Sequence, residues 1–143
     1  MNTIIFLVED DVFFADNLKL LLEFSGKYKV FHFVNGLDAL AAAKENEPDI
    51  VISDIKMPDV NGFEFCEIFR KSGFYHIPFL FLTCSYSFGD FRKGMNLGAD
   101  DFLLKPVKLA DLTKAIEIRL QKSAKIENRY LNATMGNTIT LMR

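Results

Sequence analysis

Two groups of carboxylates in this chain of 143 residues directly follow short apolar runs. Asp54 comes immediately after residues 49–53, and Glu9, Asp10 and Asp11 stand together at the end of another apolar run. Clustered carboxylates repel one another unless they share a cation, and hard oxygen ligands favour Mg²⁺, or Mn²⁺ in its place. The acids therefore predict a divalent metal site, provided that the fold brings the two groups together.

The elements that would position these acids alternate along the chain. Five short apolar runs separate longer amphipathic stretches, which is the pattern of βαβ units and a parallel sheet in an α/β domain. Strands are expected near residues 3–8, 29–34, 49–53, 78–82 and 101–105. Helices are expected over residues 12–25, 36–45, 62–71 and 87–97, with a last helix after Pro106.

The spacing of apolar residues also predicts which helix faces are buried. Phe65 and Phe69 share such a face in the third expected helix, and Phe88, Phe91 and Met95 share one in the fourth. Phe is unusually common, with 15 residues, and most of them fall inside apolar runs. We interpret them as core residues rather than as an aromatic binding surface.

Residues 1–122 are expected to form one domain, followed by a C-terminal extension over residues 123–143. The apolar seam of the last helix continues through Ala124 and Leu131, and its regular pattern is lost after Asn132. Two interpretations stay open for the extension. It is either a fraying helix with a loose tail, or a helix that links the domain to an output domain outside these residues.

Composition excludes several classes of partner. The net charge of -2, from 17 basic and 19 acidic residues, gives no general attraction to nucleic acid or to an anionic membrane. Met1 is followed by a polar residue and only a short apolar run, so we expect a soluble, cytoplasmic protein without a signal peptide or spanning helix. Cys66 and Cys84 lack the spacing of a zinc site or a disulfide framework, and we expect reduced, buried or half-buried thiols.

In an open parallel sheet, ligands bind beyond the carboxyl ends of the strands. The fourth expected strand ends in Thr83 and the fifth in Lys105, so four strands deliver polar groups to one edge. A metal held by Asp10 and Asp54 would leave open positions for a phosphoryl oxygen, while Lys105 neutralises a second oxygen and Thr83 donates to a third. This set predicts a phosphoryl-transfer site in which Asp54 is the acceptor.

The chain resembles the receiver domains of bacterial two-component response regulators over roughly residues 3–122. The motifs that carry the resemblance are Ile5-Phe6-Leu7-Val8-Glu9-Asp10, Ser53-Asp54-Ile55-Lys56-Met57-Pro58 with Gly62, Phe81-Leu82-Thr83, and Asp101-Phe102-Leu103-Leu104-Lys105-Pro106. The resemblance implies a (βα)5, flavodoxin-like, doubly wound sheet of five parallel strands in the order 2-1-3-4-5, with helices on both faces. It also implies a phosphorelay signal-transduction switch rather than an enzyme, with no activity beyond its own phosphorylation and dephosphorylation.

Residue roles follow from the same resemblance. Asp54 would receive its phosphoryl group from a sensor histidine kinase or a phosphotransfer protein. Asp10 would bind Mg²⁺ directly, Glu9 through water and Lys56 through its backbone carbonyl, and Asp54 would complete the metal site. Lys105 would pair with the Asp54 carboxylate or with its phosphate.

The resemblance also implies a route by which the signal leaves the site. Thr83 would swing toward the phosphoryl group, and Phe102, which stands where tyrosine is frequent, would turn inward as an aromatic switch. The Lys105–Pro106 peptide would be cis. The responding face, about residues 87–122, would then form a homodimer or dock a downstream effector domain or protein. Asp11 is expected to cap the following helix rather than to bind metal.

Two other classes compete with this interpretation. An aspartyl-phosphate-type, Mg-dependent phosphohydrolase would need its nucleophile on the first strand, a second aspartate two residues later, and a cap domain. The order Glu9-Asp10-Asp11 does not fit that spacing. A non-phosphorylated receiver-like scaffold would be expected to lack the acceptor or the lysine, and here Asp54 and Lys105 are both present.

Overall fold

The computed structural model describes the backbone of residues 2–142 and the side chains of residues 2–133. Strands and helices alternate strictly along the chain. The elements are β1 (Thr3–Val8), α1 (Val12–Glu23), β2 (Tyr28–Phe33), α2 (Gly36–Glu45), β3 (Ile50–Ser53), α3 (Gly62–Lys71), β4 (Phe79–Thr83), α4 (Phe88–Leu97), β5 (Asp101–Leu104) and α5 (Leu109–Met142). All the expected strands and helices are confirmed, with ends that differ by at most two residues except in the last helix.

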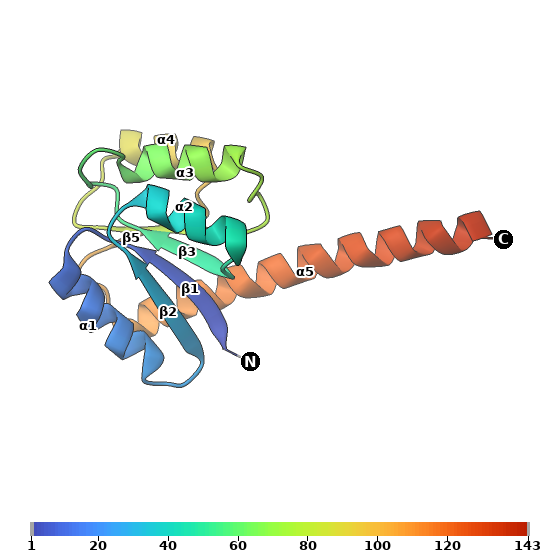
Figure 1. The fold of residues 1–143 in the computed structure, drawn as a ribbon, viewed down its shortest axis with the longest axis horizontal. Coiled ribbons are helices and arrows are strands. Elements are labelled where there is room, and N and C mark those ends of the chain that lie inside the picture. The colour runs from blue at the N-terminus through green and yellow to red at the C-terminus, as the bar shows by residue number, and fades with distance from the viewer. Residues whose placement is uncertain (1, 143) are drawn as a thin grey trace.

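The five strands form one parallel sheet in the order β2-β1-β3-β4-β5. Helices α1 and α5 cover one face of this sheet, and α2, α3 and α4 cover the other (Figure 1). This confirms the doubly wound arrangement. The strand order reverses between β1 and β3, which is the point where such sheets bind ligands.

Two apolar layers hold the sheet between its helices. Under α2, α3 and α4 the layer is aromatic, with Phe65, Phe69 and Phe79 among its buried members. Under α1 and α5 it is aliphatic, with residues such as Leu22 and Ile116. Strands β3 and β4 are buried on both faces, as expected for the centre of a parallel sheet. Most of the phenylalanines are therefore core residues, as expected.

The orientation of α4 differs from the expected one. Phe88 and Met95 are exposed, and the buried residue of this helix is Gly94. The reason is steric, because the ring of Phe102 occupies the space that a side chain at position 94 would need. The helix packs on the sheet through its glycine, and this turns Phe88 and Met95 toward the outside, whereas Phe91 is partly buried against the core as expected.

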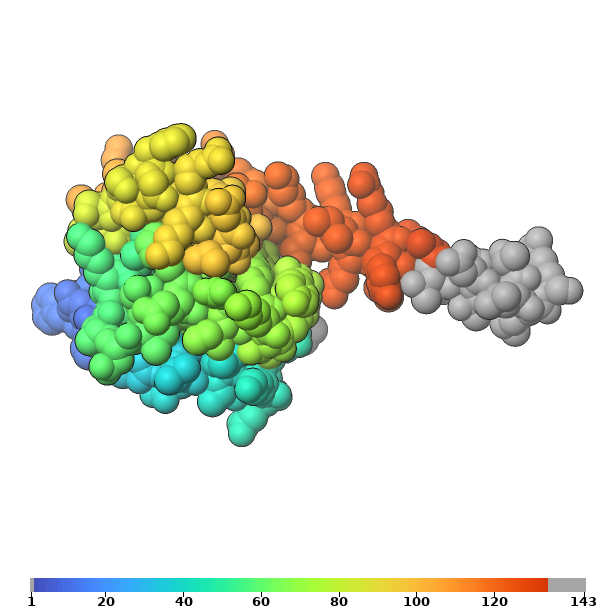
Figure 2. All heavy atoms as spheres, turned by 90° about the horizontal axis from the view of Figure 1, so that it is seen from above, coloured from blue at the N-terminus to red at the C-terminus, as the bar shows by residue number. Residues whose placement is uncertain are grey.

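Helix α5 runs without a break over 34 residues and continues past the expected domain end at residue 122. Its first turns pack on the sheet through Leu112 and Ile116, and its later turns project away from the domain (Figures 1 and 2). The loose tail considered after Asn132 is helical as far as Met142. Loss of the apolar pattern therefore does not mark the end of the helix, and packing on the domain ends before that loss, since every described side chain from residue 124 to residue 133 is exposed. Across the described residues, no helix is both long and apolar enough to cross a membrane.

Candidate functional site

Three carboxylates meet at the carboxyl ends of β1 and β3. The two strands are paired so that Val8 lies beside Ser53, which places the following residues next to each other. The Asp54 N–H donates to the carbonyl of Val8 across 3.0 Å. Glu9, Asp10 and Asp54 each offer a carboxylate oxygen, and these oxygens all lie within 4.8 Å of one another. The expected gathering of the two acidic groups is thus confirmed.

The loop after β3 fixes the direction of the Asp54 side chain. One of its oxygens, Oδ1, accepts a hydrogen bond from the Ile55 N–H at 2.6 Å. The Gly62 N–H donates to the Ile55 carbonyl at 2.7 Å, which draws the start of α3 against the loop. A Cβ atom on Gly62 would overlap the Asp54 carbonyl oxygen. Glycine at position 62 therefore permits the close approach that holds Asp54 in place.

Lys105 lies between two of the acids. Its Nζ donates to Asp54 Oδ2 at 3.1 Å and also to Glu9 Oε1. The ring of Phe14 covers the ammonium group, with 4.1 Å from Nζ to the ring centroid. The Lys105–Pro106 peptide is cis, as the resemblance implies. The sequence had not identified Phe14 as part of this site.

Electrostatics at the site follow from burial and from Lys105. Burial raises the pKa of the Glu9 carboxyl, although the hydrogen bond and charge of Lys105 oppose that shift. For Lys105, burial acts to lower the pKa, but the bonds to Glu9 and Asp54 outweigh it and the pKa is raised. The ammonium form of Lys105 is therefore strongly favoured in this site.

Asp10 and Asp11 have different environments although they are neighbours. The Asp11 side chain accepts a hydrogen bond from the Phe14 N–H at 3.1 Å and caps α1. This confirms that Asp11 serves as a helix cap. Asp10 is exposed and keeps its carboxylate at the mouth of the site.

His32, which the sequence pattern did not connect with the site, contacts it directly. The imidazole Nε2 lies 2.7 Å from the backbone carbonyl oxygen of Glu9. A carbonyl oxygen can only accept, so Nε2 carries the proton in this bond. The Glu9 N–H in turn donates to the Phe33 carbonyl at 2.9 Å. Strand β2 therefore holds both backbone groups of Glu9 and, through them, the peptide that leads into Asp10.

Thr83 and Lys56 lie toward the α4 side of the site. The buried Thr83 hydroxyl donates to the Ser85 carbonyl, with 3.4 Å between the oxygens. The Lys56 ammonium donates to the Ser85 hydroxyl at 3.3 Å. Both side chains thus contact the loop between β4 and α4, and the metal-binding role of the Lys56 carbonyl stays a prediction.

Phe102 is buried in this structure, and its movement on phosphorylation stays a prediction. Its ring packs against Phe81 and Tyr86, each with 5.0 Å between ring centroids, and against Phe91 at 5.3 Å. The missing side chain of Gly94 leaves the space that the ring fills. In this conformation the ring already occupies the inward position.

The two cysteines differ in their exposure. Cys66 is buried, and burial raises the pKa of its thiol to about 12. Cys84 is exposed, so the expectation of a buried or half-buried thiol is wrong at that position. Cys84 follows the last residue of β4, where the chain leaves the sheet and turns toward α4.

Comparison with known proteins gives a consistent family assignment. The family model described as the response regulator receiver domain matches residues 5–117. The DNA-binding response regulator MtrA of Mycobacterium tuberculosis (strain ATCC 25618 / H37Rv) is 31% identical over 123 residues, which is 86% of this chain and 53% of that protein. The probable transcriptional regulatory protein SilR of Salmonella typhimurium is 37% identical over 118 residues, covering 82% of this chain and 51% of that protein. The chain thus spans about half the length of these relatives.

Solved structures show the same fold. The receiver domain protein (CheY-like) of Methanospirillum hungatei JF-1 superposes with a TM-score of 0.79 at 32% identity, covering 87% of this chain and 98% of that chain. The chemotaxis protein CheY4 of Vibrio cholerae gives a TM-score of 0.77 at 30% identity, covering 82% of this chain and 98% of that chain. The strand order and the helices on both faces agree with this similarity.

Proposed function

The chain belongs to the response regulator receiver domain family of two-component systems, and from that premise we propose that Asp54 is its phosphoacceptor. Proteins of this family act as phosphoacceptor switches and not as classical enzymes. The observation that carries the proposal is the position of Lys105, whose ammonium bridges Asp54 and Glu9 at the edge where three carboxylates meet. Asp54 therefore faces a cation that is already in place before a phosphoryl group arrives.

The transfer step uses one carboxylate oxygen of Asp54 as the nucleophile. The donor is a phosphohistidine of a sensor kinase or of a phosphotransfer protein. An Asp54 oxygen bonds to phosphorus as the nitrogen–phosphorus bond breaks, and the imidazole leaves with the bond's electron pair and takes up a proton. Attack of water on phosphorus later releases phosphate and restores the carboxylate. We propose that these are the only reactions of the domain.

The donor set fits a divalent cation. Three carboxylates and one ammonium leave two negative charges uncompensated at the site, and hard carboxylate oxygens suit Mg²⁺ or Mn²⁺. Asp10 and Asp54 would bind the ion directly, Glu9 through water and Lys56 through its carbonyl. The ion would supply positive charge for the phosphoryl oxygens. Lys105 would provide the second cation, and its bond to Asp54 would pass to the phosphoryl group.

An apolar stripe on α1 suits the docking of the phosphodonor. Phe13, Leu20 and Phe24 recur at helical spacing and are 79%, 70% and 93% exposed. Helix α1 begins beside the acidic cluster, and Phe14 from its first turn already covers Lys105. A kinase or phosphotransfer helix packed on this stripe would have its phosphohistidine close to Asp54.

The phosphorylated state would be read through Thr83 and Phe102. A phosphoryl group adds roughly two negative charges and three acceptor oxygens, which compete with Ser85 for the Thr83 hydroxyl. Movement of Thr83 would change the loop that carries Tyr86, and Tyr86 packs on the Phe102 ring. We propose that this alters the face formed by α4, β5 and the first half of α5, where a homodimer or an effector binds.

Residues 1–122 would then be the receiver unit and residues 123–143 a helical link toward an effector. Since the curated relatives extend to about twice the length of this chain, the output of the whole protein is a separate question. The DNA-binding activity in the name of MtrA belongs to that protein. With a net charge of -2, this chain is proposed to act through protein contacts and not by binding nucleic acid itself.

The proposal is tested by incubating the protein with acetyl phosphate and Mg²⁺ and measuring its intact mass. One phosphoryl adduct is expected in the wild type and in Asp59→Asn, which changes an exposed acid of the same loop. No adduct is expected in Asp54→Asn. Steady phosphate release from unrelated monoesters would support a phosphohydrolase instead, and the absence of any adduct would leave a binding scaffold.

A further inference from the structure

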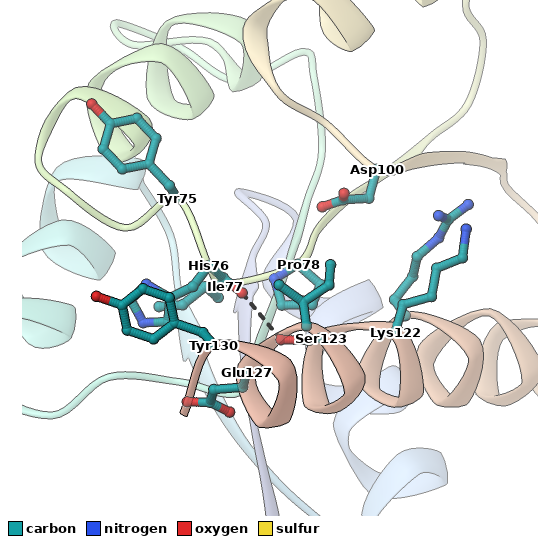
Figure 3. A pocket seen from close by; sticks show the side chains of 11 residues that line it. Tyr75, His76, Ile77, Pro78, Asp100, Lys122, Ser123, Glu127 and Tyr130 are labelled. Carbon is teal, nitrogen blue, oxygen red and sulfur yellow. Dashed lines mark hydrogen bonds between the residues drawn. The ribbon is translucent and has the colours of Figure 1, made fainter. Parts of the chain in front are cut away.

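A groove of about 530 Å³ lies at the edge of the sheet opposite the acidic cluster (Figure 3). One wall is the loop before β4, with Tyr75, Ile77 and Pro78, and the other wall is a face of α5. The two walls are tied together where the Ser123 hydroxyl donates to the His76 carbonyl at 3.2 Å. The groove is mostly apolar where these walls meet and has room for a few side chains.

The α5 wall of the groove continues onto the part of the helix whose described side chains do not pack against the rest of the domain. Its lining residues recur at intervals of three and four and so form one face: Arg119, Lys122, Ser123, Ile126, Glu127 and Tyr130. Ile126 and Tyr130 are 68% and 72% exposed, and every described side chain from residue 124 to residue 133 is exposed. Helices gain most of their stability from packing of one face, so this face is expected to have a partner.

Charge is distributed unevenly along this face. Arg119 and Lys122 make one half basic, whereas Glu127 and Tyr130 make the other half acidic and aromatic. Within the described residues, neither Lys122 nor Glu127 takes part in an ion pair of its own chain. The two lie five residues apart, which does not bring them together on one helix. The face is therefore complementary to itself when it is turned end for end.

We propose that this groove seats the α5 helix of a second copy of the chain, antiparallel to the first. A two-fold axis at the height of Ala124 and Lys125 brings Lys122 against Glu127 of the second copy, and the reverse contact follows by symmetry. The same axis brings Arg119, whose guanidinium also lies 4.0 Å from Asp101 of its own chain, next to Tyr130 of the second copy, and Ser123 against its Ile126. A parallel pair would instead place Lys122 beside Lys122 and Glu127 beside Glu127.

This interface goes beyond the proposed phosphoacceptor function, because it lies at the far edge of the sheet from Asp54 and requires no phosphoryl group. Arg119 and Lys122 also lie within the first half of α5, at the border of the face through which the phosphorylated state is proposed to act, whereas Ile126, Glu127 and Tyr130 lie beyond it. A single helical face is smaller than the interface of a stable dimer, so a weak, concentration-dependent dimer is expected. A failure to find this dimer would leave the acetyl phosphate experiment unaffected.

The test is sedimentation equilibrium of the unphosphorylated chain over a wide range of concentrations. The wild type is expected to dimerise, and Lys122→Glu and Glu127→Lys are each expected to weaken the dimer about tenfold or more, since each places two pairs of like charges in contact. An equimolar mixture of these two variants is expected to dimerise again, because each residue then meets an opposite charge. Circular dichroism verifies that each variant keeps its helix.

Lys125→Glu is the matched control, since it makes the same charge change on α5 outside the groove face and is expected to leave the dimer intact. A wild type that stays monomeric throughout overturns the proposal. So does a dimer that Lys122→Glu and Glu127→Lys leave unchanged. If Lys122→Glu and Glu127→Lys are each monomeric and their equimolar mixture stays monomeric as well, the antiparallel pairing is wrong.

Discussion

The ring of Phe102 lies against Gly94, so close that a Cβ atom at residue 94 would overlap the ring's Cζ atom. Phe81 and Tyr86 enclose the ring from other sides. The inward position of Phe102 therefore depends on the absence of a side chain on the facing helix. This relationship links the proposed switch residue to the surface of α4 on which a partner would bind.

Gly94→Ala is expected to displace the Phe102 ring. Because a Cβ atom at residue 94 would overlap two atoms of the buried ring, the cost is expected in the upper part of the range of about 1 to 3 kcal/mol for overpacking, above the roughly 1 kcal/mol that alanine gains over glycine in a helix. The control is Gly89→Ala in the same helix, where the nearest contact of the added Cβ, with the Ser87 hydroxyl oxygen, is 3.6 Å. Denaturant unfolding should show loss of stability only in Gly94→Ala, and ring contacts between Phe102 and Phe81 should weaken in NMR spectra. Intact contacts and unchanged stability would show that the space is not limiting.

Lys105→Met is expected to destabilise the protein and to slow phosphorylation. Removing the ammonium leaves the largely buried carboxylates of Glu9 and Asp54 without their counter-charge, which costs roughly 3 kcal/mol. Added Mg²⁺ should restore more stability in Lys105→Met than in the wild type, because the ion meets an additional uncompensated negative charge. Thermal unfolding with and without Mg²⁺ measures this difference. Lys108→Met, at an exposed lysine nearby, should behave like the wild type.

His32 is expected to act on metal binding through the backbone of Glu9. In His32→Gln the amide nitrogen takes the place of Nε2 and keeps the bond to the Glu9 carbonyl, whereas the shorter side chain in His32→Asn does not reach it. Loss of such an outer hydrogen bond costs roughly tenfold in metal affinity. Calorimetric titration with Mg²⁺ should therefore show weaker binding by His32→Asn and near-normal binding by His32→Gln. Equal affinities for the two variants would mean that this hydrogen bond does not position the site.

Tyr28 predicts how stability changes at alkaline pH. Burial, followed by the hydrogen bond that its hydroxyl donates to Glu117, raises the Tyr28 pKa above its ordinary value of 10.0. The unfolded chain therefore loses this proton first as the pH rises. The stabilising contribution is complete below pH 10 and is lost as the pH rises above 10 toward the folded-state pKa.

Tyr28→Phe should lower stability at neutral pH by about 1 kcal/mol and should lose less stability than the wild type above pH 10. Urea unfolding at a series of pH values measures both effects. Tyr75→Phe is the control, since Tyr75 is exposed. Parallel pH profiles for the wild type and Tyr28→Phe would contradict the assigned hydrogen bond.

The positions of Asp10, Asp54 and Lys105 were predictable because a parallel sheet gathers the carboxyl ends of its strands at one edge. In these strands, the polar residue that ends each apolar run could therefore be assigned to the site from the local sequence alone. The helix cap of Asp11 was predictable for the same reason, since it depends on a hydrogen bond only three residues away.

Other features depend on contacts between distant segments and were not predictable. His32 contacts the backbone carbonyl of Glu9, and any residue type at position 9 would offer that carbonyl, so the sequence does not reveal the contact. The one feature that could have indicated it is the pairing of β2 with β1, which places the ends of the two strands side by side. The rotation of α4 depends on Phe102 filling the space at Gly94. Helix α5 continues after its apolar pattern stops, because helical hydrogen bonds do not need that pattern. In the first two cases packing geometry, and not local propensity, determined the outcome.

Asp54 alone is proposed to accept the phosphoryl group, and chemical trapping of the phosphorylated residue tests this assignment. The protein is treated with acetyl phosphate and Mg²⁺, reduced with borohydride and digested with trypsin, and the peptide of residues 45–56 is sequenced by mass spectrometry. An acyl phosphate is reduced to an alcohol, so homoserine is expected at position 54, with Glu45, Glu47 and Asp49 of the same peptide unchanged. Homoserine at another aspartate, or an unmodified Asp54 in protein that carries the phosphoryl adduct, would contradict the assignment.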